Sequence, residues 1–134
     1  MRGTGTLQHD IDALEQTNAR MRAVFEAKSG NWKLELVKLR RIQGVQLSIL
    51  SESLGKWAGQ VLDPGDRETA TRLFAEMRRS VGTTQAEWPL SLINDAESLR
   101  RYNAASQHAI AASTAFFSWI KTHLRRPEQG IELR

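Results

Sequence analysis

The three histidines, His9, His108 and His123, are the side chains best suited to acid–base or metal chemistry in this chain. A zinc or di-iron site on helices uses histidines and carboxylates that repeat at three or four positions along one face. No two histidines have that spacing, so the sequence predicts no metal site and no bound cofactor. We expect His108 to be packed or half-exposed, and His123 to act with Arg125 as a cation at the end of a helix.

Nucleophilic catalysis is equally poorly supported. The chain contains no cysteine, which excludes thiolate chemistry, disulfides and cysteine-ligated metals. Ser106, Ser113 and Ser118 lie in a segment rich in small residues without the strained turn that activates a serine. The carboxylates are dispersed among lysines and arginines, as on a solvated helix surface. The sequence therefore predicts a protein that is not an enzyme, with no catalytic residues.

Tryptophan is the unusual residue type, because the chain has four tryptophans and a single tyrosine. Trp32 and Trp57 fall on an apolar helical stripe, which favours a place in the core. Tryptophan is also enriched among the residues that dominate protein interfaces. We interpret Trp88 and Trp119 as candidates for that second use.

The formal net charge of +4 permits attraction to an anionic partner, and four arginine doublets supply much of the positive charge. They are Arg40-Arg41, Arg78-Arg79, Arg100-Arg101 and Arg125-Arg126. Neighbouring residues on a helix point about 100° apart, so a doublet is more typical of a solvated flank than of a recognition surface. Nucleic-acid binding is therefore a less favoured hypothesis that the sequence does not exclude.

The elements that carry these residues are helical, because apolar residues recur every three or four positions from Leu7 to Phe25. Asn18 occupies one position of this stripe, where it can fix the register of a coiled-coil pairing. Ser29-Gly30-Asn31 then offers a break, although one long kinked helix over residues 7–62 is also possible.

The strongest helical pattern runs from Trp32 to Leu62. Its main stripe includes Leu36, Leu39, Ile42, Leu47, Leu50, Leu54 and Val61. Further apolar residues widen this face beyond what one neighbouring helix can cover, namely Leu34, Val37, Val45 and Ile49. Three glycines in the same helix predict close approach of another backbone, namely Gly44, Gly55 and Gly59.

The rest of the chain is divided by clear breaks. Asp63 and Pro64 predict a turn with an aspartate cap, and the next helix should end near Gly82. Residues 83–94 read as an irregular connection over the core. The spacing of Asn94 and Glu97 predicts the start of a last helix that ends at Pro127.

These features predict an all-α antiparallel helical bundle of three to four amphipathic helices. We expect one domain over residues 7–126, a flexible amino terminus over 1–6 and a flexible tail over 127–134. No export signal and no apolar run of membrane-spanning length is visible, so elimination favours the cytoplasm.

The order of a long helix from Trp32 to Gln60, a break at Asp63-Pro64, a helix to Val81 and an Ala/Ser-rich helix from Tyr102 to Trp119 resembles the phasins. Phasins coat polyester storage granules in bacteria. The resemblance covers about Leu14 to Leu124 and rests on pattern rather than on a motif, so it implies no functional residue. It implies a role on the surface of an apolar granule or membrane.

The leading prediction is a non-catalytic helical interaction or assembly protein that acts through self-association or a protein partner. Its candidate interaction surface comprises Leu34, Val37, Val45, Ile49, Trp88 and Trp119. Coating of an apolar surface and electrostatic binding of nucleic acid are the alternatives.

Overall fold

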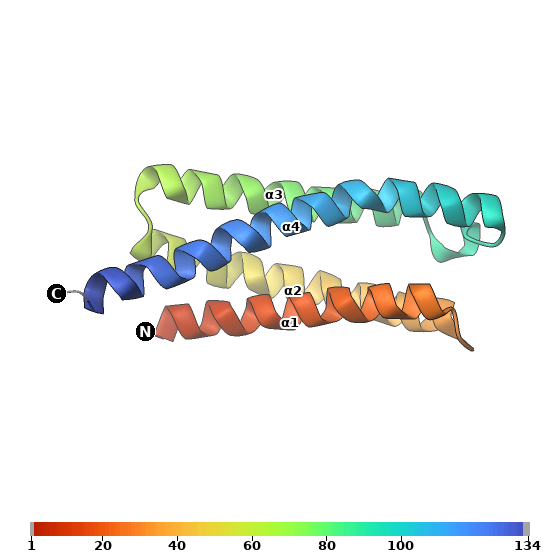
Figure 1. The fold of residues 1–134 in the computed structure, drawn as a ribbon, viewed down its shortest axis with the longest axis horizontal. Helices are drawn as coiled ribbons and strands as arrows, with labels where there is room; N and C mark the ends of the chain where they lie inside the picture. Colours follow the sequence, from red (N-terminus) through yellow and green to blue (C-terminus); the bar gives the residue numbers. More distant parts are fainter. Residues whose placement is uncertain (1, 133–134) are drawn as a thin grey trace. The chain divides into compact units, whose positions relative to one another are not determined.

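The computed structural model describes the backbone of residues 2–132 and the side chains of residues 5–125. Within that range the chain forms four α-helices and a short 3-10 helix and contains no strand, which confirms the all-α prediction. In chain order they are α1 (Arg2–Ala27), α2 (Trp32–Val61), α3 (Pro64–Glu87), η1 (Leu90–Leu92) and α4 (Ala96–Glu132) (Figure 1). The chain divides into two compact units, residues 1–57 and 58–134, with the boundary inside α2. The single domain over residues 7–126 stays a prediction.

In the first unit, α1 and α2 run antiparallel, side by side (Figure 1). The facing positions of both helices repeat at alternating steps of four and three, the spacing of a coiled-coil seam. They are Leu7, Ile11, Leu14, Asn18 and Met21 on α1 and Leu36, Arg40, Gln43, Leu47, Leu50 and Leu54 on α2. The leucines and the isoleucine of this set are buried. The polar pair at its centre is bonded, because Gln43 Nε2 donates to Asn18 Oδ1 at 2.8 Å.

The connection between α1 and α2 is a true break, so residues 7–62 form two helices. Lys28 continues the last turn through a hydrogen bond from its N–H to the Val24 carbonyl at 2.9 Å. Its φ of 49° and the φ of 53° at Gly30 turn the chain through the left-handed region. Asn31 precedes α2, and its carbonyl accepts from the Glu35 N–H at 3.0 Å.

The amino-terminal boundary differs from the one the sequence predicts. The apolar stripe begins at Leu7, but the helical backbone of α1 already begins at Arg2. Helical hydrogen bonding needs no apolar side chain, so periodicity locates the packed part of a helix rather than its first turn. Met1 lies outside the described residues.

In the second unit, the predicted turn at Asp63 and Pro64 is confirmed. Asp63 Oδ1 accepts from the Asp66 N–H at 2.8 Å, which caps the first turn of α3. Pro64 occupies the first helical position, where the missing N–H costs nothing.

The carboxyl end of α3 lies beyond the predicted one. The helix continues through Gly82 to Glu87, and the Trp88 N–H then bonds the Thr84 carbonyl at 2.9 Å. One glycine costs only about 1 kcal/mol in a helix, so Gly82 does not stop it. The irregular connection expected over residues 83–94 is therefore confined to the part after Glu87.

The start of α4 is capped one residue later than predicted. The Ser98 N–H donates to Asp95 Oδ1 at 2.7 Å, and Ser98 Oγ accepts from the Asp95 N–H at 3.0 Å. This reciprocal pair is a capping box built on Asp95 and Ser98 rather than on Asn94 and Glu97. Because the two alternatives differ by one register position, spacing alone did not separate them.

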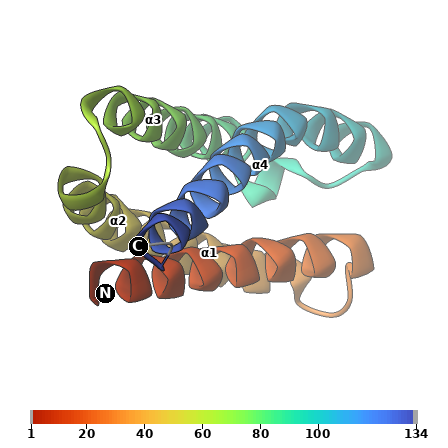
Figure 2. The ribbon, with the colours of Figure 1, turned by 60° about the vertical axis from the view of Figure 1, so that its left-hand side comes forward.

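In the second unit, α3 and α4 run antiparallel, with α4 inclined to α3 (Figure 2). The Phe74 and Phe116 rings meet edge to face at 5.5 Å between centroids, and Phe117 packs on Phe116 at 5.6 Å. Toward the other end, Trp88 meets Tyr102 edge to face at 6.1 Å. These aromatic contacts fix the register of the second hairpin.

The prediction that Pro127 ends the last helix is wrong, because α4 continues to Glu132. Proline in a helix interior removes one hydrogen bond without forbidding the helix. Residues 127–132 of the predicted tail are therefore helical, and residues 133–134 lie outside the described part.

The close-approach explanation for the three glycines of α2 is also wrong. A Cβ added at Gly44, Gly55 or Gly59 would meet no atom within 4 Å. The glycines therefore lower the stability of α2 without being required by a neighbour.

None of the helices in the described range is sufficiently long and apolar to cross a membrane.

Candidate interaction surface

The most prominent candidate site is an exposed row of apolar side chains on α2. Leu34 is 53% exposed, Ile42 46%, Val45 60% and Ile49 51%. At 100° per residue these four lie within one 80° sector of the helix. We call them the α2 stripe.

The α2 stripe lies on the opposite side of the helix from the seam that contacts α1. Leu36, Gln43 and Leu47 define that seam, and all three are buried. Their mean direction is roughly 160° from that of the α2 stripe when the helix is drawn at 100° per residue. The helix is thus apolar on two opposite sides, and α1 covers one of them.

Charged side chains surround the α2 stripe. Lys38 and Arg41 lie among its amino-terminal positions, and Glu52 and Lys56 continue the same sector beyond Ile49. Lys56 Nζ lies 4.0 Å from Glu52 Oε1, and both side chains are exposed. Lys38 separates Leu34 from the other three, so Ile42, Val45 and Ile49 form an apolar centre with charged residues before and after it along the helix. Such a composition is usual for a protein-binding surface.

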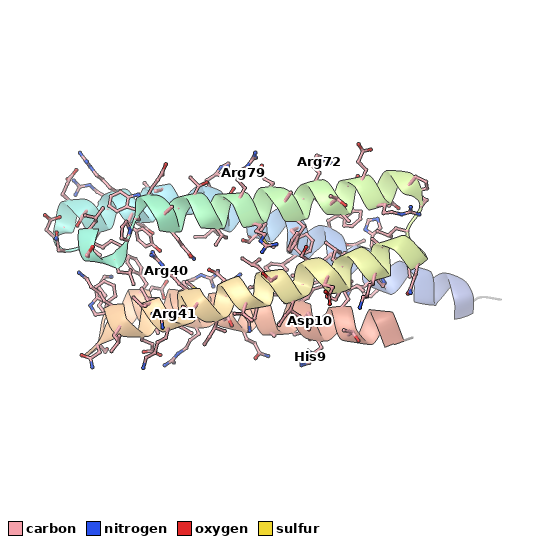
Figure 3. All side chains as sticks on the ribbon, turned by 180° about the vertical axis from the view of Figure 1, so that it is seen from behind. His9, Asp10, Arg40, Arg41, Arg72 and Arg79 are labelled. Carbon is pink, nitrogen blue, oxygen red and sulfur yellow. The ribbon has the colours of Figure 1, made fainter. Side chains whose placement is uncertain are left out.

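The arginine doublets are distributed over α2, α3 and α4. Figure 3 labels Arg40 and Arg41, adjacent residues of α2, of which Arg40 is half-buried and Arg41 exposed. Figure 3 also labels Arg72 and Arg79 on α3, and Arg79 forms an ion pair with Glu76. Arg100 and Arg101 both pair with Glu97. Three of the doublet arginines are thus paired with two carboxylates of their own helices.

The predicted surface residues fall into two groups. Leu34, Val45 and Ile49 are exposed together on the α2 stripe, whereas Val37 is half-buried at its flank. Trp88 and Trp119 are half-buried in the second unit, at the end of α3 and on α4. Trp119 stacks on the His123 ring at 3.8 Å between centroids.

Ile42 belongs to the α2 stripe, although the sequence pattern placed it on the main buried stripe. The true seam passes through Arg40 and Gln43 at this point of the helix. Because Arg40 and Gln43 are both polar, a pattern based on apolar residues alone passes over them and places the neighbouring Ile42 on the buried side of the helix. A strict alternation of four and three from Leu36 would have found the seam and left Ile42 outside it.

The prediction that His108 is packed or half-exposed is wrong, because 74% of its side chain is exposed. It takes part in a small polar cluster between α3 and α4. Its Nε2 lies 3.2 Å from Glu76 Oε2, and Ser80 Oγ donates to the same oxygen at 3.4 Å. The hydrogen bond from His108 is the main cause that lowers the pKa of Glu76, assisted by Arg79 and opposed by partial burial.

This cluster does not have the order of a catalytic triad. In a triad the histidine lies between the nucleophile and the carboxylate and accepts the hydroxyl proton. Here Glu76 lies between Ser80 and His108, so its carboxylate occupies the position that the base would need. Among the described residues, no group of three His, Asp or Glu side chains could hold a metal ion.

The prediction that His123 lies at a helix end is wrong. His123 is 8% exposed and lies well before the end of α4, which runs to Glu132. Its Nδ1 bonds the Trp119 carbonyl at 2.9 Å, and its Nε2 lies 3.7 Å from Asp66 Oδ2 in the first turn of α3. It is thus a packed residue of the second hairpin.

On the first helix, His9 Nδ1 lies 3.3 Å from Asp10 Oδ1 (Figure 3). His9 is 82% exposed at its side chain. The pair joins neighbouring residues of α1, with the imidazole of His9 in solvent. It therefore adds no second candidate site.

Comparison of the chain with protein-family models, with curated proteins and with solved structures gives no match.

Proposed function

We propose that this chain is a non-catalytic helical interaction protein that binds through the α2 stripe. The supporting observation is that Leu34, Ile42, Val45 and Ile49 are each about half exposed on one sector of a helix whose opposite side is already packed. Apolar residues scattered singly over a surface need no explanation, but four exposed on one sector of a helix, three of them within residues 42–49, are typical of a binding surface.

Energetics support the same reading. Burial of apolar surface contributes roughly 25 cal/mol for each Å² removed from water, so covering four half-exposed aliphatic side chains is worth several kcal/mol before the cost of association. No polar contact competes for these side chains. Either self-association or a protein partner would supply the cover.

Sedimentation velocity of a fluorescently labelled full-length chain, in buffer and in cell extract, tests this proposal. Val45→Glu places a charge in the middle of the α2 stripe, and Ser51→Glu is the matched control at an exposed position of α2 outside it. Self-association predicts a faster boundary in buffer, and another protein partner predicts one in extract alone. In both cases Val45→Glu should restore the monomer rate and Ser51→Glu should not.

The proposal is contradicted if the unaltered chain and Val45→Glu sediment alike, as monomers, in buffer and in extract. Circular dichroism of both variants must show unchanged helix content, because a misfolded variant would also lose its partner. Val45 is 60% exposed, so its substitution should leave the packing of α2 intact.

A second candidate function is the coating of an apolar granule or membrane surface, which the same exposed row also favours. A helix with one apolar side and charged flanks can lie along an apolar–water boundary. Partitioning of the purified chain onto polyester particles and its loss in Val45→Glu would support this role. Nucleic-acid binding has less support, because Arg79, Arg100 and Arg101 already pair with carboxylates.

A further inference from the structure

We infer that the α2 stripe is covered by the α2 stripe of a second copy, in an antiparallel pairing whose two-fold axis passes beside Val45. This inference rests on the proposed function and names the partner. It is carried by the placement of the charged residues around the α2 stripe.

A two-fold axis beside Val45 places each residue that lies n positions before Val45 opposite the residue n positions after it in the other copy. Lys38 lies seven residues before Val45 and Glu52 seven residues after it. Seven residues are nearly two helical turns, roughly 10 Å along the axis, and leave both side chains within about 20° of the direction of Val45. The pairing therefore brings Lys38 of each copy opposite Glu52 of the other.

The remaining positions are also compatible. Arg41 falls opposite Ile49, and Lys56 falls opposite Leu34, so two long aliphatic stems lie over apolar side chains while their charged groups reach water. Ile42 falls opposite Ser48, a small residue that leaves room for it.

Two other ways to pair the same surfaces are less favourable. A parallel pairing in register places Lys38 opposite Lys38 and Glu52 opposite Glu52, which repel. An antiparallel pairing centred two residues later, at Leu47, places Lys38 opposite Lys56 and again brings like charges together. The axis beside Val45 instead gives two Lys38–Glu52 contacts and places Lys56 opposite Leu34 rather than opposite a lysine.

The absence of cysteine from the chain makes the geometry directly testable by disulfide formation. Facing residues of two close helices meet the Cα separation of about 4.4–6.8 Å that a disulfide needs, whereas residues several turns apart do not. Val45→Cys should form a covalent dimer under mild oxidation, because Val45 faces itself across the axis. Ser51→Cys, which is exposed on α2 but outside the α2 stripe, is the control.

A mixture of Lys38→Cys and Glu52→Cys chains then determines the direction of pairing. The antiparallel arrangement predicts a disulfide between the two different chains and little between identical ones. A homodimeric disulfide of Lys38→Cys alone would show parallel pairing and overturn the inference. Dimer yield from Val45→Cys no greater than from Ser51→Cys would also overturn it.

Charge exchange provides an independent measurement on the unlinked protein. Lys38→Glu replaces two attractive contacts with two repulsive ones and should weaken dimerisation about tenfold, which corresponds to about 1.4 kcal/mol spread over these exposed contacts. Adding Glu52→Lys to the same chain should restore the original affinity. Failure of the second substitution to rescue the first would contradict the register.

These outcomes separate the two proposals. A chain that is monomeric in buffer but sediments faster in extract, and loses that shift in Val45→Glu, would overturn self-pairing and leave the proposed function standing. If the unaltered chain sediments as a monomer both in buffer and in extract, both proposals are overturned.

Discussion

The hydrogen bond between Asn18 and Gln43 should couple the two helices of the first unit energetically. Gln43 is 6% exposed, and its Nε2 donates to Asn18 Oδ1 at 2.8 Å in the middle of an otherwise leucine-rich seam. Removing one partner from a buried hydrogen bond costs about 1–3 kcal/mol, because the remaining polar group is desolvated. We therefore expect Asn18→Leu alone and Gln43→Leu alone each to lower the free energy of unfolding by that amount.

The double variant should behave differently from the sum of the single variants. With Asn18→Leu and Gln43→Leu together, no polar amide remains in this layer and two aliphatic side chains are buried. The double variant should be at least as stable as the unaltered chain, so the coupling energy should be about 2 kcal/mol or more.

Urea unfolding followed by circular dichroism measures the four free energies of this cycle. A matched control cycle combines Asn18→Leu with Ser51→Leu, an exposed residue of α2 outside the seam, and should be additive within about 0.5 kcal/mol. Equal additivity in the Asn18 and Gln43 cycle would refute the claim that this pair sets the packing of α1 on α2.

Three further predictions concern single positions. Gly55→Ala should raise the free energy of unfolding by about 1 kcal/mol in chemical denaturation, since an added Cβ would meet no atom within 4 Å; a loss of stability would show a contact that the structure lacks. Lys28→Gly should be more stable than Lys28→Ala by about 1 kcal/mol in the same assay, because φ is 49° there and both substitutions remove the same contact of Lys28 with the Phe25 ring. His108→Ala should raise the pKa of Glu76, measured by NMR titration, because the histidine hydrogen bond is the main cause that lowers it. In the unaltered chain, the contribution of the Glu76 carboxylate to stability is present above its unfolded pKa and is lost as the pH falls through its folded pKa. An unchanged Glu76 pKa in His108→Ala would contradict this assignment.

The helices themselves were predictable from periodicity. The pattern from Trp32 to Leu62 predicted α2, which spans Trp32–Val61, and the Asp63-Pro64 break predicted the cap and first turn of α3. These features are local, so their chemistry can be read without knowing what packs against them.

Helix ends were less predictable where a weak local signal competed with the continuation of the helix. Gly82 and Pro127 both lie inside helices, because one glycine or one proline costs only a few kcal/mol at most and neighbouring turns can offset it. Asp95 rather than Asn94 caps α4, because both residue types can cap and only the backbone conformation selects one.

The candidate surface was predictable in part. The excess of apolar residues on α2 led to Leu34, Val45 and Ile49, which are exposed, but polar seam residues concealed that Ile42 belongs with them. The burial of His123 against Trp119 could not be read from its spacing, because that contact depends on how α4 meets α3.

A photo-crosslinking scan along α2 tests the central claim most directly. A photoreactive residue is placed in turn at each position from Leu34 to Ser51 of the full-length chain in cells, and the yield of covalent adducts is measured. The claim that the α2 stripe binds another chain predicts maxima at Leu34, Ile42, Val45 and Ile49 and minima at seam positions and at Ser51. A yield without helical periodicity, or one no higher on the α2 stripe than at Ser51, would contradict it.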